Sequence, residues 1–501
     1  MDISTLAVVM ALFAVTAGTA VWWVLSRRHQ HGLFRRHGIP GPRPDLLDGN
    51  WAQLKKDRIE VGSRGRSRCR REVQCFYIKL GHQESKFLIQ GSPRQLEFPP
   101  PPFPRGPHQS EIVPQYRYAA GDQWKKVRAV LSPCFNASKM KLMTQIMGSC
   151  ADAMLEVVED RVEKGETVEV YSVSQGLSLD VIAKCAFAWQ VDCQKNPHDP
   201  LLLSIRKMFQ EIDDSVLRQA IRFPILCKII SSLLFFTSYS KTLTAIYDNV
   251  RRVVELRRKG QSPRTTDMLQ MMLDAQSSIL DNTNNTGQKK KLMEDHHLFG
   301  NCFIFLAAGF ETTATLLDFV IHLLAKYPEE QDRILNEVNK VFPEKDQDLT
   351  YDGVQELKRL DMVIRESLRL YPPVVLFVSR HCREDTTIMG QFIPAEANII
   401  VPTWHIHHDP ELWPEPFKFD PERFAEGLNT GHSAAYLPFG LGPRVCIGKG
   451  FAVLEIKMAL CKLIRKYRIR QCRETQDPVK LVVPTVTINP EKGISVKFEH
   501  R

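Results

Sequence analysis

A single cysteine lies inside a run of glycine, proline and arginine near the C-terminal end, in the stretch PFGLGPRVCIGKG from Pro438 to Gly450. The segment directly behind it, FAVLEIKMALCKLI, has apolar residues at helical spacing. Backbone N–H groups in a tight turn and the N-terminus of a helix both stabilise a thiolate. Cys446 is therefore either a buried cysteine in a glycine turn or a thiolate that this turn and helix would stabilise.

An acid and a hydroxyl stand side by side in AAGFETTA, residues 307–314, inside a long and almost wholly apolar helical pattern. Glu311 and Thr312 are costly in such surroundings unless they are paired or hydrated. A threonine can also hydrogen-bond to the carbonyl four residues earlier and bend its helix, which here would open a groove beside Gly309. Phe305 and Ala308 share the face of Thr312 at helical spacing and are candidate substrate contacts.

The cysteine stretch resembles the haem-binding loop of the cytochrome P-450 family, the haem-thiolate monooxygenases. Five positions fit the pattern F-x-x-G-x-R-x-C-x-G: Phe439, Gly442, Arg444, Cys446 and Gly448. The resemblance implies a haem b cofactor with Cys446 as the axial iron ligand. It also implies that the glycines at 442 and 448 let the backbone pass close to a flat macrocycle. An electron-rich axial thiolate favours O–O bond cleavage.

The acid–hydroxyl segment matches the family's oxygen-activating helix. By that resemblance Thr312 would hydrogen-bond dioxygen and Glu311 would help to relay protons. W-x-x-x-R in WKKVR places two side chains on one helical face, where the family makes a charge-assisted contact with a haem propionate. The residues that match propionate-binding positions are Trp124, Arg128, Arg380 and Arg444.

Two further segments, ESLRLYPP and FDPERF, supply a Glu-Arg-Arg set. Glu366, Arg369 and Arg423 resemble the family's structural cluster, which locks the surroundings of the cysteine loop. The apolar residues Val375 and Leu376 are expected to line the substrate pocket, and they do not identify a substrate.

A histidine-rich stretch and several lysines allow other interpretations. His405, His407 and His408 could suggest a metal site, but the resemblance assigns this stretch to a meander before the cysteine loop, so we reject a histidine site. Four lysines flank the motifs expected on the cysteine side of the haem. They form either a basic face for an acidic electron donor or an ordinary solvated surface: Lys125, Lys126, Lys449 and Lys457.

The elements that must position these groups are mostly helical from Trp124 to about residue 340. One helical pattern ends on Gly165, a helix stop, and another, apolar on nearly all sides, ends before Pro328 and belongs in the middle of a large protein. Strand-like runs lie at 75–81, 86–91 and near 398–404, and 483–499 predicts a hairpin turning at Pro490 to Gly493. The predicted fold class is mainly α with small β-sheets, the cytochrome P-450 fold, preceded by a single N-terminal transmembrane helix.

The N-terminus is uncharged from Ile3 to Ser26, long enough to cross a bilayer core of about 30 Å. Arginines follow at once, so the positive-inside rule places the downstream chain in the cytosol. A cleaved signal peptide is the alternative, but the apolar run is too long for a typical one. We therefore predict an anchor at 1–26, a basic and proline-rich spacer at 27–50, and a haem-binding catalytic domain at 51–501.

Composition narrows the remaining classes. The twelve cysteines show no CxxC pair or compact spacing, which argues against a zinc site or a disulfide framework; most are predicted to be small buried hydrophobes. The net charge of +10 comes without interleaved aromatic residues or a recognised module, so we expect no nucleic-acid partner. The very apolar segment Ile221 to Phe236 is either a core helix or a surface that dips into the bilayer.

The resemblance breaks between about residues 57 and 117. Lys55 to Arg71 carries eight basic residues against two acidic ones, and Pro93 to Gln109 holds seven prolines. A proline run cannot form the amphipathic helix that the family usually has in this region. The region is either a divergent loop or an error in the translated sequence.

The motifs together are most similar to animal microsomal enzymes of the family's third clan, the family 3 and thromboxane synthase group. The implied function is monooxygenation of an apolar steroid, lipid or foreign compound, with O2 and with electrons from NADPH through a reductase. The implied location is the endoplasmic reticulum membrane, with the catalytic domain on the cytosolic side. The alternatives are a reductase-independent peroxide isomerase, as in thromboxane synthase, and a haem-binding protein inactivated by the 57–117 region.

Overall fold

The computed structural model describes residues 121–211, 238–261, 267–277, 293, 295–344, 347–375, 379–382, 384–388, 391–395, 397–426, 433–483 and 487–501, with a few single positions between 17 and 28. The strand-like runs at 75–81 and 86–91, the segment 221–236 and the atypical region lie outside these residues. So does nearly all of the predicted anchor. The chain divides into two units, Leu80–Arg383 with Glu396–Arg501, and Met1–Lys79 with Glu384–Ala395.

Most described residues are helical, as the sequence predicts. The α-helices are α6 (Gly121–Leu131), α7 (Ala137–Glu163), α8 (Val170–Phe187), α9 (Pro200–Glu211), α12 (Ser238–Arg258), α13 (Met268–Ser277), α14 (Asp295–Lys326), α15 (Pro328–Val341), α16 (Tyr351–Glu356), α17 (Lys358–Leu370), α18 (Thr403–His407) and α19 (Lys449–Lys466). The 3₁₀ turns are η3 (Ser132–Phe135), η5 (Pro421–Phe424), η6 (Ser433–Ala435) and η7 (Gly442–Arg444).

The described strands are short and pair antiparallel. They are β1 (Val168–Glu169), β2 (Ser379–His381), β3 (Thr386–Ile388), β4 (Gln391–Ile393), β5 (Asn398–Ile400), β6 (Tyr467–Gln471), β7 (Leu481–Val482), β8 (Asn489–Pro490) and β9 (Ser495–His500). One sheet has the order β1-β9-β6, and the pairs β2-β5, β3-β4 and β7-β8 stand alone. The β3-β4 hairpin belongs to the smaller unit.

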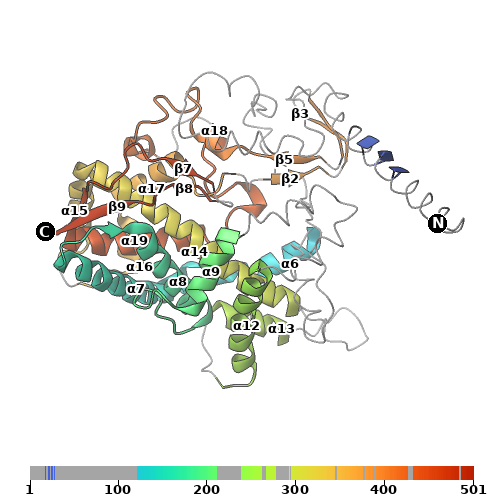
Figure 1. Cartoon of the computed structure of the whole chain (residues 1–501), viewed down its shortest axis with the longest axis horizontal. Coiled ribbons are helices and arrows are strands. Elements are labelled where there is room, and N and C mark those ends of the chain that lie inside the picture. The colour runs from blue at the N-terminus through green and yellow to red at the C-terminus, as the bar shows by residue number, and fades with distance from the viewer. Residues whose placement is uncertain are drawn as a thin grey trace, which may run out of the picture. The chain divides into compact units, whose positions relative to one another are not determined.

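Helix α14 crosses the middle of the larger unit beside α8 (Figure 1). Its sequence is apolar on nearly every side because helices surround it, and Phe310, Phe319 and Val320 are fully buried. It is long and apolar enough to span a membrane, but 72% of its most apolar 18-residue stretch is buried inside the protein, as in a core helix. Gly309 lets α8 come close, since a Cβ at this position would lie 3.1 Å from Ile182 Cγ1.

The helix ends follow the predicted signals. Helix α7 stops two residues before Gly165, whose φ of 70° is one that glycine adopts freely. Helix α14 ends at Lys326, and Pro328 begins α15.

The predicted C-terminal hairpin is wrong in its pairing. The turn exists, with Gly493 N–H donating to the Pro490 carbonyl at 3.3 Å. However, β8 pairs with β7, while β9 pairs with β1 and β6. Strand propensity and a turn signal fix a reversal of the chain, but burial against distant segments decides which edges meet.

Candidate functional site

The cysteine loop is built from two left-handed glycines and a 3₁₀ turn. Gly440 and Gly442 have φ of 73° and 80°, a conformation that side chains disfavour. Cys446 N–H donates to the Phe439 carbonyl at 2.9 Å, which closes the loop. Among the nine cysteines that the structure describes, Cys446 is the exposed one. Gly442 is therefore required by its backbone angle, whereas a Cβ on Gly448 would meet no atom of the described residues within 4 Å.

The surroundings of the Cys446 thiol shift its pKa in two opposite directions. Although Cys446 is exposed overall, burial by its loop raises the pKa of the thiol. Hydrogen bonds from the backbone at Gly448 and Lys449 and the charge of Arg128 act to lower that pKa. Gly448 is the N-cap of α19, so the helix N-terminus points its free N–H groups toward a negative charge.

Arginines from three separate elements converge on this loop. Arg128 of α6 donates to the Val445 carbonyl at 2.9 Å, and Arg380 of β2 donates to the Leu441 carbonyl at 3.0 Å. The Arg444 guanidinium lies 4.1 Å from the centre of the Trp124 ring. Burial, together with the charges of Arg380 and Arg128, lowers the pKa of Arg444 to about 10. Clustered like charges of this kind suit a ligand that carries carboxylates.

One face of α14 stays open although the helix is central. Ala308 is exposed, Thr312 is half-buried, and Ile304 on the same face is 39% exposed. Thr312 Oγ1 donates to the Ala308 carbonyl at 2.7 Å, the back-bond expected from the sequence. Sequence reasoning missed Ile304, which its spacing of eight residues before Thr312 could have indicated.

Phe305 lies in the core rather than on that open face. It is 8% exposed, and its ring centroid is 6.0 Å from that of Phe135. The Phe135 ring centroid also lies 6.4 Å from that of Phe451, in the first turn of α19. Phe135 therefore joins α14 to α19, the helix behind the cysteine. Val375 is buried at 8% exposure, and Leu376 lies outside the described residues.

Glu311 points away from the open face into a buried polar cluster. Its carboxylate accepts from Tyr171 Oη at 2.5 Å and from Gln175 Nε2 at 3.4 Å. It also accepts from Thr487 Oγ1 at 3.1 Å and Asn489 Nδ2 at 3.2 Å. Four donors around one carboxylate match its acceptor capacity. Sequence spacing could not find these partners, because they come from α8 and from residues 487–489 near the C-terminus.

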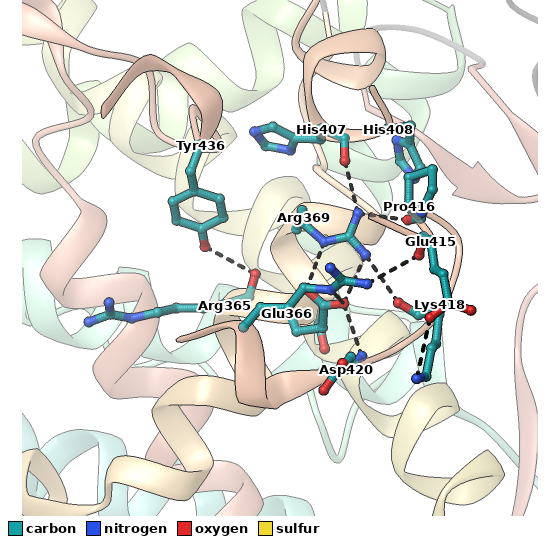
Figure 2. Close-up of polar contacts among 12 residues, drawn as sticks. Arg365, Glu366, Arg369, His407, His408, Glu415, Pro416, Lys418, Asp420 and Tyr436 are labelled. Atoms are coloured by element: carbon teal, nitrogen blue, oxygen red, sulfur yellow. Dashed lines mark hydrogen bonds and ion pairs between the residues drawn. The ribbon is translucent and has the colours of Figure 1, made fainter. Parts of the chain in front are cut away.

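The Glu-Arg-Arg residues come together as a buried cluster (Figure 2). Arg369 binds both carboxylate oxygens of Glu366, at 2.7 and 2.8 Å. It also donates to the carbonyls of His407, Pro416 and Lys418. Arg423 lies 3.5 Å from Glu366. The cluster therefore ties α17 to the irregular chain that precedes the cysteine loop.

The histidines of this stretch take part in the same packing. His407 Nε2 accepts from the Leu437 backbone N–H at 2.8 Å, and His408 Nδ1 lies 2.9 Å from the Trp404 carbonyl. Burial lowers the pKa of both to about 3. Both rings thus serve as neutral structural partners.

The four flanking lysines do not form one surface. Lys125, Lys126 and Lys449 are exposed. Lys457, in contrast, is 2% exposed, pairs with Asp361 at 3.5 Å, and reaches the carbonyls of Val354 and Leu357. Neither alternative for the lysines, a basic face for an electron donor or a solvated surface, applies to Lys457, because it lies on the buried side of α19.

Comparison with known proteins decides the family. Residues 112–498 match the family model described as Cytochrome P450. The chain belongs to the cytochrome P450 family. It is 32% identical to Cytochrome P450 3A5 of Homo sapiens over 94% of this chain and 93% of that protein. It is 35% identical to Cytochrome P450 3A12 of Canis lupus familiaris over 94% of this chain and 93% of that protein. The chain is thus a P450 monooxygenase, an oxidoreductase similar to animal family 3.

The residues of the loop fit the haem that the P450 family implies. Cys446 would be the ligand of the haem iron, and the space beside Gly448, which no described residue fills, would admit the edge of the cofactor. The arginine cluster with Trp124 would hold the propionates. When bound, haem supplies the activation of dioxygen. The individual roles of Arg128, Arg380 and Arg444 remain predictions.

Proposed function

We propose that this P450 is anchored in the endoplasmic reticulum membrane by residues 1–26 and oxidises an apolar small molecule on the cytosolic side. The substrate class is a steroid, a lipid or a foreign compound. Electrons reach the P450 from NADPH through a membrane-bound reductase. The uncharged run from Ile3 to Ser26 and the arginines after it support the anchor and its orientation.

The observation that carries the proposal is the surroundings of Cys446. An exposed thiol at a helix N-terminus, next to clustered arginines, suits a thiolate ligand with propionate contacts beside it. The half-buried Thr312 supplies a hydroxyl on the open, otherwise apolar face of α14. The chain's own residues would thus bind the cofactor, admit an apolar substrate and place a hydroxyl beside it.

The acid–hydroxyl pair favours a monooxygenase over a peroxide isomerase. A monooxygenase must take up protons, and Glu311 is held by four donors behind Thr312. An isomerase that rearranges a peroxide needs neither reductase nor proton uptake.

The test uses the full chain expressed in microsomes. The reduced wild-type protein should give the thiolate-type carbon monoxide difference band, and Cys446→Ser should abolish it. Cys472→Ser is the matched control, because this half-buried cysteine lies outside the cysteine loop and should retain the band.

With reductase present, product should form only when NADPH is added. Turnover of a lipid peroxide without NADPH would instead favour the isomerase. A well-expressed wild-type chain without the band would exclude both enzymes and favour the inactive haem-binding alternative. Deletion of 1–26 should release the protein into an alkaline carbonate wash, and retention in the pellet would refute the single anchor.

A further inference from the structure

A stripe of polar residues runs along the buried side of α14 beyond the acid–hydroxyl pair. Glu311, Thr315, Asp318 and His322 follow at steps of four, three and four residues, which places them on one helical face. Each is at most 3% exposed. Such a row of polar groups in an otherwise apolar core helix requires a reason, because burying them without partners is costly.

The stripe begins in the Glu311 cluster. Thr315 Oγ1 donates to Asn489 Oδ1 at 3.1 Å, and Asn489 Nδ2 reaches both Glu311 and the Tyr171 hydroxyl, at 3.2 and 3.3 Å. Tyr171 in turn donates to Glu311. Hydroxyl and amide groups therefore connect Glu311 without a break to the next turn of the helix.

Asp318 is the unexplained member of the stripe. Among the residues described by the structure, neither of its carboxylate oxygens has a hydrogen-bond partner. Burial, followed by the charge of Glu169, raises the pKa of Asp318 well above its usual value, which favours the protonated form of the carboxyl group. Asp318 also lies close enough to Tyr171 to help raise the pKa of the phenol, after burial and Glu311. A buried acid without hydrogen-bond partners among the described residues thus lies beside the Glu311 cluster.

His322 brings the stripe near the surface. Its Nδ1 has no partner among the described groups, and burial lowers its pKa to about 4, opposed by Asp477 and reinforced by Lys326. Lys326 and Asp477 form an ion pair at 2.6 Å, and each is about a third exposed. The imidazole therefore lies between a buried acid and a solvated pair of charges.

We propose that this face of α14 is a proton path, carrying protons from the solvent at Lys326 and Asp477 through His322 and Asp318 to Glu311. The inference rests on the proposed function, since a monooxygenase turnover consumes protons: RH + O2 + 2 e⁻ + 2 H⁺ gives ROH + H2O. Neighbours on one helical face are about 5–6 Å apart at Cβ.

The transfers balance at every group. The Tyr171 hydroxyl gives its proton to the Glu311 carboxylate, and its oxygen takes the proton of Asp318. Asp318 regains a proton from His322, which takes one from solvent. Glu311 must then turn from its buried cluster toward the open face to pass its proton toward Thr312, after which every group ends as it began. Asp318 and His322 act through Glu311 and are positioning residues for the proton supply.

The experiment compares Asp318→Asn and His322→Gln with Glu455→Gln in the full chain. Glu455 is a matched control, because it is a fully buried carboxyl on another helix that binds Ser178 rather than the stripe. Three quantities are measured in each protein: the infrared band of protonated carboxyl groups, NADPH-driven product formation with its solvent isotope effect, and product formation driven by hydrogen peroxide.

The expected results separate proton supply from folding. Asp318→Asn should remove one protonated-carboxyl band from the ligand-free protein, a readout independent of turnover. Both stripe variants should lower NADPH-driven product formation about tenfold and increase its solvent isotope effect, while the control stays near the wild-type rate. Peroxide-driven product should stay near the wild-type level in all variants, because hydrogen peroxide supplies the oxygen, electrons and protons together.

Several outcomes would overturn the proposal. It fails if the wild type lacks the Asp318 band, or if both stripe variants keep the wild-type rate and isotope effect. If Asp318→Asn does not fold, His322→Gln decides alone by the same criteria. A wild-type chain that yields no product by either route would instead overturn the proposed function, and the inference with it.

Discussion

Two fully buried carboxyl groups in this P450 differ in every contact. Glu366 accepts two hydrogen bonds from Arg369 and one from the Asp420 backbone N–H at 3.0 Å. Asp318, equally buried at 0% exposure, has no hydrogen-bond partner among the described residues. A satisfied buried charge fixes local geometry, whereas an unsatisfied buried acid weakens the fold and is a candidate for proton chemistry. The comparison therefore separates a structural acid from a candidate functional one.

The largest effect is expected from breaking the satisfied group. Arg369→Met leaves the Glu366 charge buried and three carbonyls without their donor, which should lower the free energy of unfolding by about 3–5 kcal/mol and reduce haem incorporation. Thermal unfolding and haem absorbance measure both effects. Arg161→Met is the control. Its ion pair with Glu166 is about half exposed, so its loss should change the free energy of unfolding by at most about 1 kcal/mol. An Arg369→Met variant that retains haem and wild-type stability would show that Arg369 does not have this structural role.

The opposite sign is expected at the unsatisfied acid. Asp318→Leu removes a buried carboxyl without hydrogen bonds and should raise the free energy of unfolding by about 1–3 kcal/mol. The same substitution should lower NADPH-driven turnover, so stability and activity move in opposite directions. Denaturant unfolding of the haem-loaded protein measures the first quantity. Destabilisation by Asp318→Leu would mean that the carboxyl has a structural role after all, and the contrast with Glu366 would disappear.

A third buried acid lies between these two cases. Glu455 accepts one hydrogen bond from Ser178, its second oxygen has no partner among the described residues, and burial raises its pKa from 4.5 to about 8. The folded state then binds more protons than the unfolded state between pH 4.5 and about 8. The associated stability is fully present below pH 4.5 and is lost as pH rises through 8, by at most about 1.4 kcal/mol per pH unit.

Glu455→Gln should flatten this pH dependence. Unfolding free energies measured at several pH values across the interval test the sign and the size. Equal slopes in the wild type and the variant would show that Glu455 is ionised in the folded protein.

The sequence predicts the parts of the site that are local. The cysteine loop, the back-bonded Thr312 and the break at Pro328 each depend on neighbours within a few residues, and the structure contains all three. The Glu-Arg-Arg cluster was also accessible, because family resemblance supplied a contact that spacing alone does not give.

Long-range contacts were not predictable from the sequence. The partners of Glu311 lie 136 to 178 positions away, and no local pattern indicates which strand will reach it. The pairing of β9 and the burial of Lys457 failed for the same reason. The unsatisfied state of Asp318 is a property of packing, and the sequence shows only that an acid stands in an apolar helix.

The contact at Gly309 constrains how this P450 can evolve. Ile182 already lies so close that even a methyl group at 309 would force its side chain to move. A larger residue at 309 therefore requires the Ile182 side chain, or α8 that carries it, to shift by a few tenths of an ångström. Since α8 also carries Tyr171, a substitution at 309 that displaces α8 would change the distance between Glu311 and the Tyr171 hydroxyl.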